Sequence, residues 1–174
     1  MTQQTEETGQ VPDLVPPEAA AQVGKVVARA SGEVVRRDWQ RWAVAVGEDN
    51  PLWFDPEHAR AHGFDDVVAP PLYLQYAVLG VTPLDRLRAD GSSGASSGDL
   101  AFPDAPRRMA GGESTTFHRY CGHGDVVTME RRVESIVQKQ GRSGPFVLVT
   151  WRTTYTDQCD ELVAEATTSM IARP

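Results

Sequence analysis

The sequence predicts an α+β fold in which a curved antiparallel β-sheet wraps around a central α-helix. The long C-terminal part of the chain consists of β-type runs, which fall at residues 113–119, 126–138, 145–156 and 161–173. A short β-type run and helical segments precede them, so the sheet is built mainly from strands that follow one another. Residues 72–79 form a strongly apolar helix candidate, and such a helix needs a surface to cover it. The curved sheet supplies that surface.

Composition describes a globular protein of one domain. The chain has 174 residues, of which 40% are hydrophobic and 24% are charged. Its net charge of -7 disfavours binding to nucleic acid. No apolar run approaches the roughly 20 residues that a membrane span needs, and the N-terminus lacks a secretory signal. We therefore expect a cytoplasmic protein without nucleic-acid or membrane partners, with Cys121 and Cys159 as reduced thiols.

The N-terminal part begins with a tail, a strand and a helix. Residues 1–21 are polar, acidic and contain prolines, which predicts a flexible tail ahead of a single domain at residues 22–174. Residues 24–30 are a short β-type run. Asp38 is the predicted N-cap of a helix that ends at Gly47. The apolar residues that recur at helical spacing in it are Trp39, Trp42, Ala43 and Val46.

A turn, a short helix and the central helix come next. Proline disfavours the helical region for the residue before it, so Asn50-Pro51 predicts a turn. Asp55 is the predicted N-cap of a helix over residues 56–62, with proline at its first position. Pro71 lies at or near the start of the central helix, where a missing N–H is tolerated.

Glycine marks the connections in the C-terminal part. Residues 91–99 are rich in glycine and serine, which is typical of a flexible loop. Gly111-Gly112 predicts a turn before the strands begin. Residues 141–144 form a predicted hairpin connection between two of the strands.

Residues 47–53 read Gly-Glu-Asp-Asn-Pro-Leu-Trp and carry a family resemblance. The segment resembles the Gly-Asp-x-Asn-Pro-x-His motif of MaoC-like (R)-specific enoyl-thioester hydratases and dehydratases. Similar motifs run through residues 43–71 and return at 111–113, 124–125 and 138–142. In order, they resemble the FAS1-like dehydratase, or MaoC N-terminal, branch of the hot-dog superfamily. The resemblance implies a hot-dog fold and a substrate carried on CoA or phosphopantetheine, with no further cofactor and no metal.

The chain departs from the family pattern where the family does its chemistry. Active members use the Asp and the His of the motif to activate water, and here Glu48 and Trp53 stand at those positions. Active members usually carry a His-Gly pair at the start of the central helix, where the glycine N–H stabilises an oxyanion. Pro70 and Pro71 stand there in this chain, and proline has no N–H to donate.

Several residues near the motif are candidate site residues. Glu48 is a candidate general base if burial tunes its pKa, and a solvated or helix-capping acid otherwise. Asp49 is a second candidate acid if the loop register shifts by one residue. Trp53 cannot transfer a proton and either plugs the vacant pocket or packs at a dimer seam. The expected substrate-binding residues, which are alternatively structural or core residues, are Asn50, Pro71, Leu72, Tyr73 and Tyr76.

Other reactive side chains give weaker signals. His58 and His62 lie four residues apart on a short helix, so either one is a geometric substitute for the missing histidine. A zinc site there lacks a third ligand. Arg107 and Arg108 are candidates for contacting a CoA phosphate, or lie in a solvated loop.

The departures shape the functional expectation. We expect a degenerate subunit that shapes the acyl site of a heteromeric 3-hydroxyacyl-thioester dehydratase or enoyl-thioester hydratase. A MaoC-like hot-dog partner would supply the Asp and the His, and an acyl-CoA or acyl carrier protein would bring the substrate. The alternatives are a self-sufficient enzyme that uses Glu48, and a non-enzymatic module that binds acyl thioesters or their carrier protein. A hot-dog thioesterase fits less well, because the Asn-Pro-Leu segment is typical of the hydratase branch.

Overall fold

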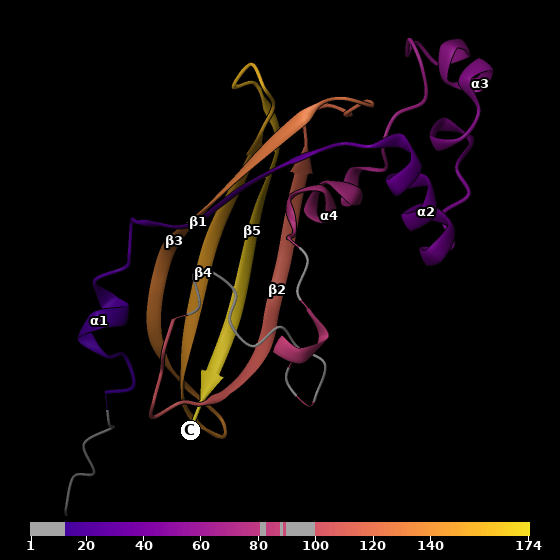
Figure 1. The fold of residues 1–174 in the computed structure, drawn as a ribbon. Coiled ribbons are helices and arrows are strands. Elements are labelled where there is room, and N and C mark those ends of the chain that lie inside the picture. Colours follow the sequence, from indigo (N-terminus) through magenta and orange to yellow (C-terminus); the bar gives the residue numbers. More distant parts are fainter. Residues whose placement is uncertain (1–12, 81–82, 88, 90–99) are drawn as a thin grey trace, which may run out of the picture.

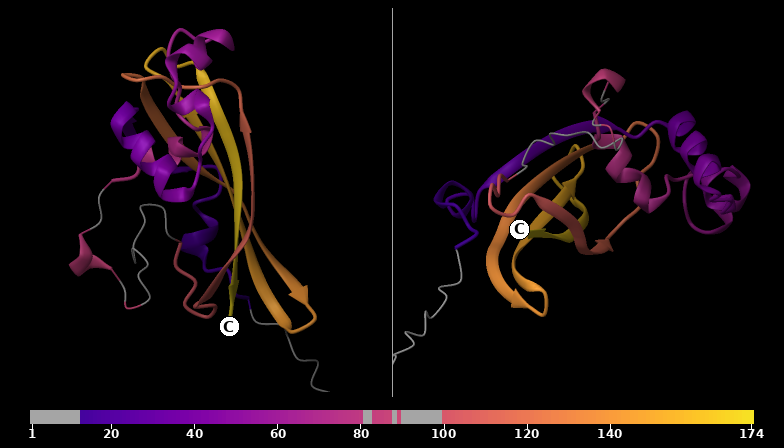
Figure 2. Two further views of the ribbon diagram at one scale, coloured as in Figure 1. Left: turned by 90° about the vertical axis from the view of Figure 1, so that its right-hand side faces the viewer. Right: turned by 90° about the horizontal axis from the view of Figure 1, so that it is seen from below.

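One antiparallel sheet forms the body of the protein (Figure 1). The computed structural model describes residues 13–80, 83–87, 89 and 100–174. The five strands lie in the order β1-β3-β4-β5-β2, and each neighbouring pair is antiparallel. Their bounds are β1 Val26–Glu33, β2 Arg107–Phe117, β3 Val126–Gly141, β4 Gly144–Thr156 and β5 Leu162–Arg173. The view from below in Figure 2 shows the curl of the sheet. The predicted α+β class and curved antiparallel sheet are confirmed.

Short helical elements lie between β1 and β2, after one turn of helix near the N-terminus. The α-helices are α1 Pro17–Ala20, α2 Arg36–Val46, α3 Pro56–Ala61 and α4 Leu74–Val78. Three single turns of 3₁₀-helix are η1 Pro51–Trp53, η2 Pro71–Tyr73 and η3 Leu84–Arg86. The predicted central helix over residues 72–79 is therefore η2 followed directly by α4.

The helix ends agree with the sequence in most places. Gly47 ends α2 in the left-handed conformation, with φ of 78°. The Asp55 carboxylate accepts hydrogen bonds from the backbone N–H groups of Glu57 and His58, at 2.9 and 3.2 Å, and so caps α3. The prediction of Asp38 as an N-cap is wrong, because α2 starts earlier and Val35 is its N-cap. Asp38 lies in the first turn, where a negative charge favours the helix dipole.

The first four strands are longer than the sequence predicted, whereas β5 begins one residue later than predicted. Residues 141–144 form the predicted hairpin connection, since Gly141 pairs with Gly144 across the β3–β4 turn. Gly111-Gly112 is not a turn: it lies inside β2, where the register with β5 shifts at a bulge. A Cβ on Gly111 would lie 2.6 Å from Ser169 Oγ and 3.2 Å from the Ser169 carbonyl carbon, so a larger residue would make Ser169 shift. The predicted loop at residues 91–99 lies outside the described residues.

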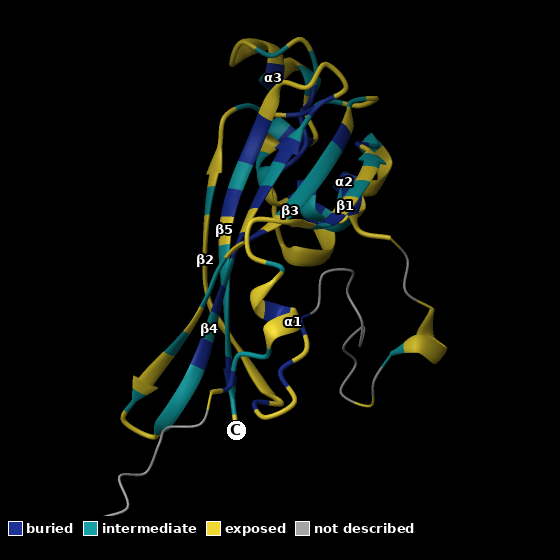
Figure 3. Ribbon diagram, turned by 90° about the vertical axis from the view of Figure 1, so that its left-hand side faces the viewer, coloured by how far each residue is buried: buried dark blue, intermediate teal, exposed yellow. Residues whose placement is uncertain are grey.

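Two apolar clusters fill the space against the sheet. Figure 3 shows which parts of the ribbon are buried. The first, which we call the helix cluster, joins α2, η1 and α4 to one end of the sheet. The second, which we call the tail cluster, joins the N-terminal residues to the other end. The largest side chains of the helix cluster are Trp39, Trp53, Tyr73 and Tyr155. The tail cluster includes Leu14, Phe102, Val133 and Trp151.

The N-terminal tail differs from its prediction. Residues 1–12 lie outside the described part of the chain, but the residues that follow are packed rather than loose. Leu14 and Ala19 are each only 3% exposed. The Leu14 N–H donates to the side-chain oxygen of Gln138 on β3, at 2.7 Å. Leucine and alanine supply the apolar contacts here, although the surrounding composition is polar.

The approach of α4 to the sheet depends on one glycine of β1. A Cβ built on Gly32 would lie 1.7 Å from the carbonyl oxygen of Ala77 in α4. No other residue type fits at that distance. The absence of a side chain at Gly32 therefore sets how closely the central helix lies on the sheet.

Candidate active-site segment

The segment after α2 folds back on the helix that precedes it. Gly47 has a positive φ that other residues rarely adopt, and the next N–H, of Glu48, donates to the carbonyl of Ala43 at 2.8 Å. This closes the end of α2 and fixes the direction in which the motif leaves it. Glu48 and Asp49 both lie exposed just past the helix end.

Asn50 and Pro51 build the turn that carries the motif forward. The Asn50 side-chain oxygen accepts a hydrogen bond from the Leu52 N–H at 3.0 Å, so it caps η1. Pro51 is the first residue of that turn, where its fixed φ is favourable. This contact supports the structural interpretation of Asn50, which was also a candidate for substrate binding.

Trp53 is held in place by contacts of both its side chain and its backbone. Its side chain is 4% exposed and belongs to the helix cluster. Its carbonyl oxygen accepts hydrogen bonds from the indole N–H of Trp39, at 3.3 Å, and from the Gln40 side chain, at 3.0 Å. Its ring contacts Tyr120 with ring centres 5.9 Å apart. Backbone and side chain are thus both held in place by α2 and by the segment before β3.

Trp53 and Glu48 contact each other. The Trp53 indole N–H donates to a carboxylate oxygen of Glu48 at 3.4 Å, a long hydrogen bond. The residues at the Asp and His positions of the motif are therefore neighbours in space as well as in sequence. An indole can donate a hydrogen bond but cannot accept or release a proton at neutral pH. Of this pair, only the Glu48 carboxylate can act as a base.

The start of the central helix offers few N–H donors. Pro70 precedes η2 and Pro71 is its first residue, as the sequence predicted. Neither residue has an N–H, and the Tyr73 N–H is used by the Pro70 carbonyl at 2.9 Å. A thioester oxygen placed beside Pro71 would lack the donor that a glycine gives at that position.

The central helix has one buried side and one exposed side. Tyr73, a predicted substrate-binding residue, is 6% exposed and lies in the helix cluster. Leu72 and Tyr76 are 54% and 53% exposed and face outward. The rings of Tyr73 and Tyr76 lie 6.0 and 5.4 Å from that of Trp42 on α2. The core interpretation thus fits Tyr73, and Leu72 and Tyr76 remain available to a ligand or a partner.

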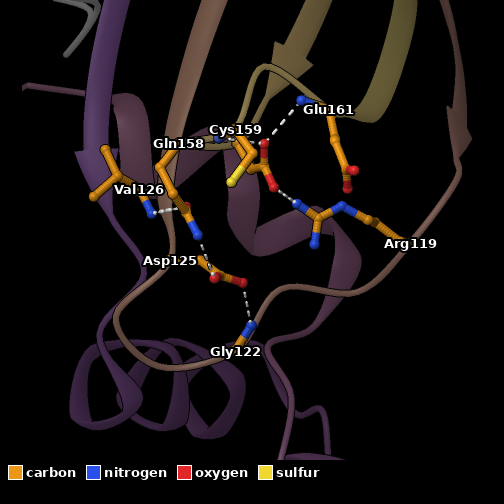
Figure 4. A network of polar contacts seen from close by, with 8 residues as sticks. Arg119, Gly122, Asp125, Val126, Gln158, Cys159 and Glu161 are labelled. Atoms are coloured by element: carbon orange, nitrogen blue, oxygen red, sulfur yellow. Dashed lines mark hydrogen bonds and ion pairs between the residues drawn. The ribbon is translucent and has the colours of Figure 1, made fainter.

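A segment of which the sequence singled out only residues 124–125 as part of a motif positions the helix start. Residues 118–125, which we call the strap, run between β2 and β3, and the Cys121 carbonyl accepts the Ala69 N–H at 2.8 Å. Figure 4 shows how the strap is tied to the β4–β5 turn. Arg119 pairs with Asp157, and Asp125 accepts from the Gly122 N–H at 2.8 Å and from the Gln158 side chain at 3.3 Å.

Asp157 is the centre of that network. It is 6% exposed and also accepts the backbone N–H groups of Cys159 and Glu161, each at 2.8 Å. Burial raises the pKa of Asp157, but these hydrogen bonds and the charge of Arg119 outweigh burial and lower the pKa below its ordinary value. The carboxylate is thus charged and satisfied, which is a structural role.

Cys121 is a poor nucleophile, and the histidine candidates contact each other. Burial raises the pKa of the Cys121 thiol to about 11, so it stays protonated at neutral pH and is a poor nucleophile. His58 and His62 stack with ring centres 4.1 Å apart, and a His62 ring nitrogen bonds to the His58 carbonyl at 2.8 Å. Among the described residues, no group of three or more His, Cys, Asp or Glu side chains could hold a metal ion.

Arg107 and Arg108 lie in β2 and not in a loop. Arg107 donates to the carbonyl of Pro174 at 2.6 Å, and Arg108 donates to the carbonyl of Leu100 at 2.5 Å. Both therefore hold backbone of this chain, and a contact with a CoA phosphate stays a prediction. No helix in the described part of the chain is long and apolar enough to cross a membrane.

Comparison with known sequences identifies similar proteins. The profile described as "FAS1-like, dehydratase domain region" matches residues 21–166. A UPF0336 protein of Parafrankia sp. is 34% identical, over 81% of this chain and 84% of that protein. A probable enoyl-CoA hydratase alpha subunit of Thermomonospora curvata is 32% identical, over 72% of this chain and 40% of that protein.

Comparison with solved structures gives the fold. The ChsH1–ChsH2 complex of Mycobacterium tuberculosis aligns with a TM-score of 0.69 and 23% identity, over 88% of each chain. The (R)-hydratase PhaJ1 of Pseudomonas aeruginosa aligns with a TM-score of 0.60 and 20% identity, over 87% of this chain and 82% of that one. At these identities the similarity concerns the fold, and the predicted hot-dog fold is confirmed.

Proposed function

Because this chain belongs to the family of FAS1-like dehydratase domain regions, we propose that it is one subunit of a heteromeric (R)-specific enoyl-thioester hydratase or 3-hydroxyacyl-thioester dehydratase. It is the degenerate subunit, which shapes the acyl site. A MaoC-like hot-dog partner supplies the Asp and the His that activate water. The substrate is an acyl chain carried as a thioester on CoA or on an acyl carrier protein.

The contact between Trp53 and Glu48 carries this proposal. Hydration needs one group that takes a proton from water and a second that orients the water or gives a proton to the acyl chain. At the positions of the family dyad the chain has one carboxylate, which accepts a hydrogen bond from an indole N–H at 3.4 Å. Trp53 is also buried and held by Trp39 and Gln40, so it cannot move aside for a substrate without loss of packing.

The start of α4 supports the same conclusion. Developing negative charge on the thioester oxygen needs N–H donors aimed at it. Pro70 and Pro71 remove two backbone donors at that point. This chain therefore lacks both a proton-transfer pair and the N–H donors for an oxyanion. A partner with a complete site would supply both.

Related proteins work as assemblies, which supports a partner. The ChsH1–ChsH2 and HadBC structures of Mycobacterium tuberculosis are complexes of two kinds of chain, and HadBC is named as a 3R-hydroxyacyl-ACP dehydratase. The relative from Thermomonospora curvata is named as an alpha subunit of an enoyl-CoA hydratase.

The partner binds over α4 and β2. Among the described residues β2 pairs with β5 on one side only, so the backbone groups of its other edge are open to a second chain. The Gln75 side chain donates to Glu113 at 3.1 Å, which places the helix and the strand side by side. Tyr76 of α4, Leu72 of η2 and Leu79 just past the end of α4 are 53%, 54% and 63% exposed. These side chains form an apolar face beside the open edge, and a MaoC-like hot-dog chain would cover it.

The test is hydration of a trans-2-enoyl-CoA by the purified chain, alone and after co-expression with a MaoC-like chain that has Asp and His intact. We expect (R)-3-hydroxyacyl product only from the complex. The variant Glu48→Gln in this chain should leave turnover of the complex unchanged, because the amide oxygen can still accept the Trp53 N–H.

Other outcomes separate the alternatives. Turnover by the chain alone that Glu48→Gln abolishes would mean a self-sufficient enzyme and would overturn the proposal. A chain that binds acyl thioesters as a stable homodimer, without turnover and without joining a MaoC-like chain, would be a binding module.

A further inference from the structure

A polar row crosses the concave face of the sheet between the two apolar clusters. Residues directly opposite each other on neighbouring antiparallel strands lie on the same face. Along one such row, Ala28 of β1 is opposite Arg131 of β3, Arg131 is opposite Thr153 of β4, and Thr153 is opposite Ala166 of β5. The row is therefore small or polar where a packed core would be large and apolar.

A cavity of about 210 Å³ lies at this row, beneath the C-terminal half of α4. Gln75 and Val78 of α4, with Leu79 just past its end, form the roof of the cavity. The side chains of its polar floor and wall are Arg131, Thr153, Tyr155, Thr168 and Glu113. Thr153 is 6% exposed and Tyr155 is 8% exposed, so these polar groups are deep within the fold.

The charged groups of the cavity are held by contacts of their own. Arg131 donates to the Thr168 hydroxyl at 3.1 Å, and its guanidinium lies 4.7 Å from the centre of the Trp151 ring. Glu113 accepts from the Gln75 side chain and from the Thr115 hydroxyl, each at 3.1 Å. One cation and one anion thus face the same cavity.

We propose that this cavity binds an uncharged oxygen-bearing group, a hydroxyl or a carbonyl, on the far part of the acyl chain. The inference rests on the proposed function, because it assigns the substrate class of that same acyl site. An acyl chain with a plain alkyl end would place methylene groups against the buried side chains of Thr153 and Tyr155, whose hydroxyls line the cavity.

The charge balance of the cavity favours a neutral group. A carboxylate on the acyl chain would be attracted by the Arg131 guanidinium and repelled by the Glu113 carboxylate. An ammonium group would be attracted by Glu113 and repelled by Arg131. A hydroxyl or a carbonyl is free of this conflict. Burial, and next the charge of Glu113, raises the pKa of Tyr155, so its hydroxyl stays protonated and can donate a hydrogen bond at neutral pH.

The position of the cavity along α4 indicates where the oxygen lies on the acyl chain. Gln75 and Leu79 follow Pro71 by four and eight residues, which is roughly 6–12 Å along a helix axis. An acyl chain that runs beneath α4 would therefore reach the cavity several bonds beyond the start of the central helix.

The test measures binding without chemistry. We would titrate the full chain, alone and in the complex with its MaoC-like partner, with the CoA thioesters of octanoate, 8-hydroxyoctanoate and octanedioate. Saturated thioesters cannot be hydrated, so calorimetry reads the dissociation constant separately from turnover. We expect the 8-hydroxyoctanoyl thioester to bind about tenfold more tightly than the octanoyl thioester, as one buried hydrogen bond would give.

Matched variants test whether the preference for the hydroxylated thioester arises in the cavity. Thr153→Val keeps the side-chain shape and removes the hydroxyl, and should abolish the preference for the hydroxylated thioester. Tyr155→Phe is a second variant that removes only a hydroxyl. Thr154→Val, on the opposite face of the same strand, is the control and should leave the preference unchanged.

Each other result overturns the inference. Equal binding of the octanoyl and 8-hydroxyoctanoyl thioesters would overturn it and leave the proposed function intact. Tightest binding of the octanedioyl thioester would show that the cavity takes an anion. Failure of the complex to bind any thioester would overturn the proposed function, and this inference with it.

Discussion

Trp53 stands at the histidine position of the motif and packs as a core residue. Its ring fills the helix cluster, its carbonyl is held by Trp39 and Gln40, and its N–H reaches Glu48. A histidine at this position would be smaller and would leave part of the space around the ring empty. The residue that removes the proton-transfer function therefore also stabilises the segment that carries it.

Replacing Trp53 tests how much its side chain stabilises the fold. We expect Trp53→Ala to lower the free energy of unfolding by about 3–5 kcal/mol, because it leaves a cavity between α2 and η1. Urea denaturation followed by circular dichroism measures the loss. The control is Phe54→Ala at the next position, where the side chain is 36% exposed and the expected loss is about 1 kcal/mol. Equal losses for the two variants would contradict the role given to Trp53.

The two cysteines should differ sharply in reactivity. Cys121 is 2% exposed with a pKa raised to about 11 by burial, whereas Cys159 is exposed. At pH 8 only about one Cys121 thiol in a thousand would be ionised, even before access is considered. Alkylation with iodoacetamide, followed by mass spectrometry, should therefore label Cys159 alone in the folded chain. In the control variant Cys159→Ser, Cys121 should be labelled only after denaturant is added. Rapid labelling of Cys121 in the folded variant would contradict this prediction and would mean that the strap opens.

At the scale of elements, the contact between β1 and α4 decides how the central helix sits. The sheet has no side chain at Gly32, and the Ala77 carbonyl occupies the space where one would be. The strap fixes the other end of the helix, through the hydrogen bond from Ala69 to Cys121. The acyl-binding region that we propose lies between these two fixed points.

The variant Gly32→Ala tests the close approach of α4. The added methyl group would lie 1.7 Å from a backbone oxygen, so either the helix or the strand must shift. We expect a loss of about 3 kcal/mol in the free energy of unfolding, at the upper end of the range for overpacking. Gly80→Ala is the control, because no atom lies within 4 Å of the position of its Cβ. A Gly32→Ala protein as stable as the control would refute this packing.

At the scale of the whole molecule, the exposed face of α4 and the open edge of β2 lie together. Both sides of β2 are largely exposed, which is unusual for a strand of a folded sheet with a buried face. A second hot-dog chain would cover this surface and leave the rest of the fold unchanged. The proposed function therefore requires the assembled complex and not this chain alone.

A charge on the exposed face should break the assembly without unfolding the chain. We expect Tyr76→Asp to weaken binding to a MaoC-like partner by tenfold or more, because it places a carboxylate in an apolar contact. Size-exclusion chromatography and calorimetry would measure the loss, and circular dichroism would check the fold. Val137→Asp, on an exposed valine near the β3–β4 hairpin, is the control. If the two variants weaken binding equally, the partner does not bind over α4.

Local signals in the sequence predicted much of the fold. Gly47 and Asp55 mark helix ends through their own backbone preferences and side-chain hydrogen bonds, and these act within a few residues. The alternating strands and the hairpin at residues 141–144 are local in the same sense. The family resemblance added the hot-dog fold, while the catalytic and substrate-binding roles of residues such as Glu48 and Asp49 stay predictions.

Contacts between distant residues were decided only by the tertiary structure. Leu14 became a core residue because Gln138 and the tail cluster lie beside it. Gly111-Gly112, which looked like a turn, became a bulge because β5 pairs on both sides of it. The concave-face cavity exists because Arg131 and Thr153 are opposite each other on paired strands. Such contacts depend on strand register and helix placement, which the whole chain determines together, and no short stretch of sequence carries that information.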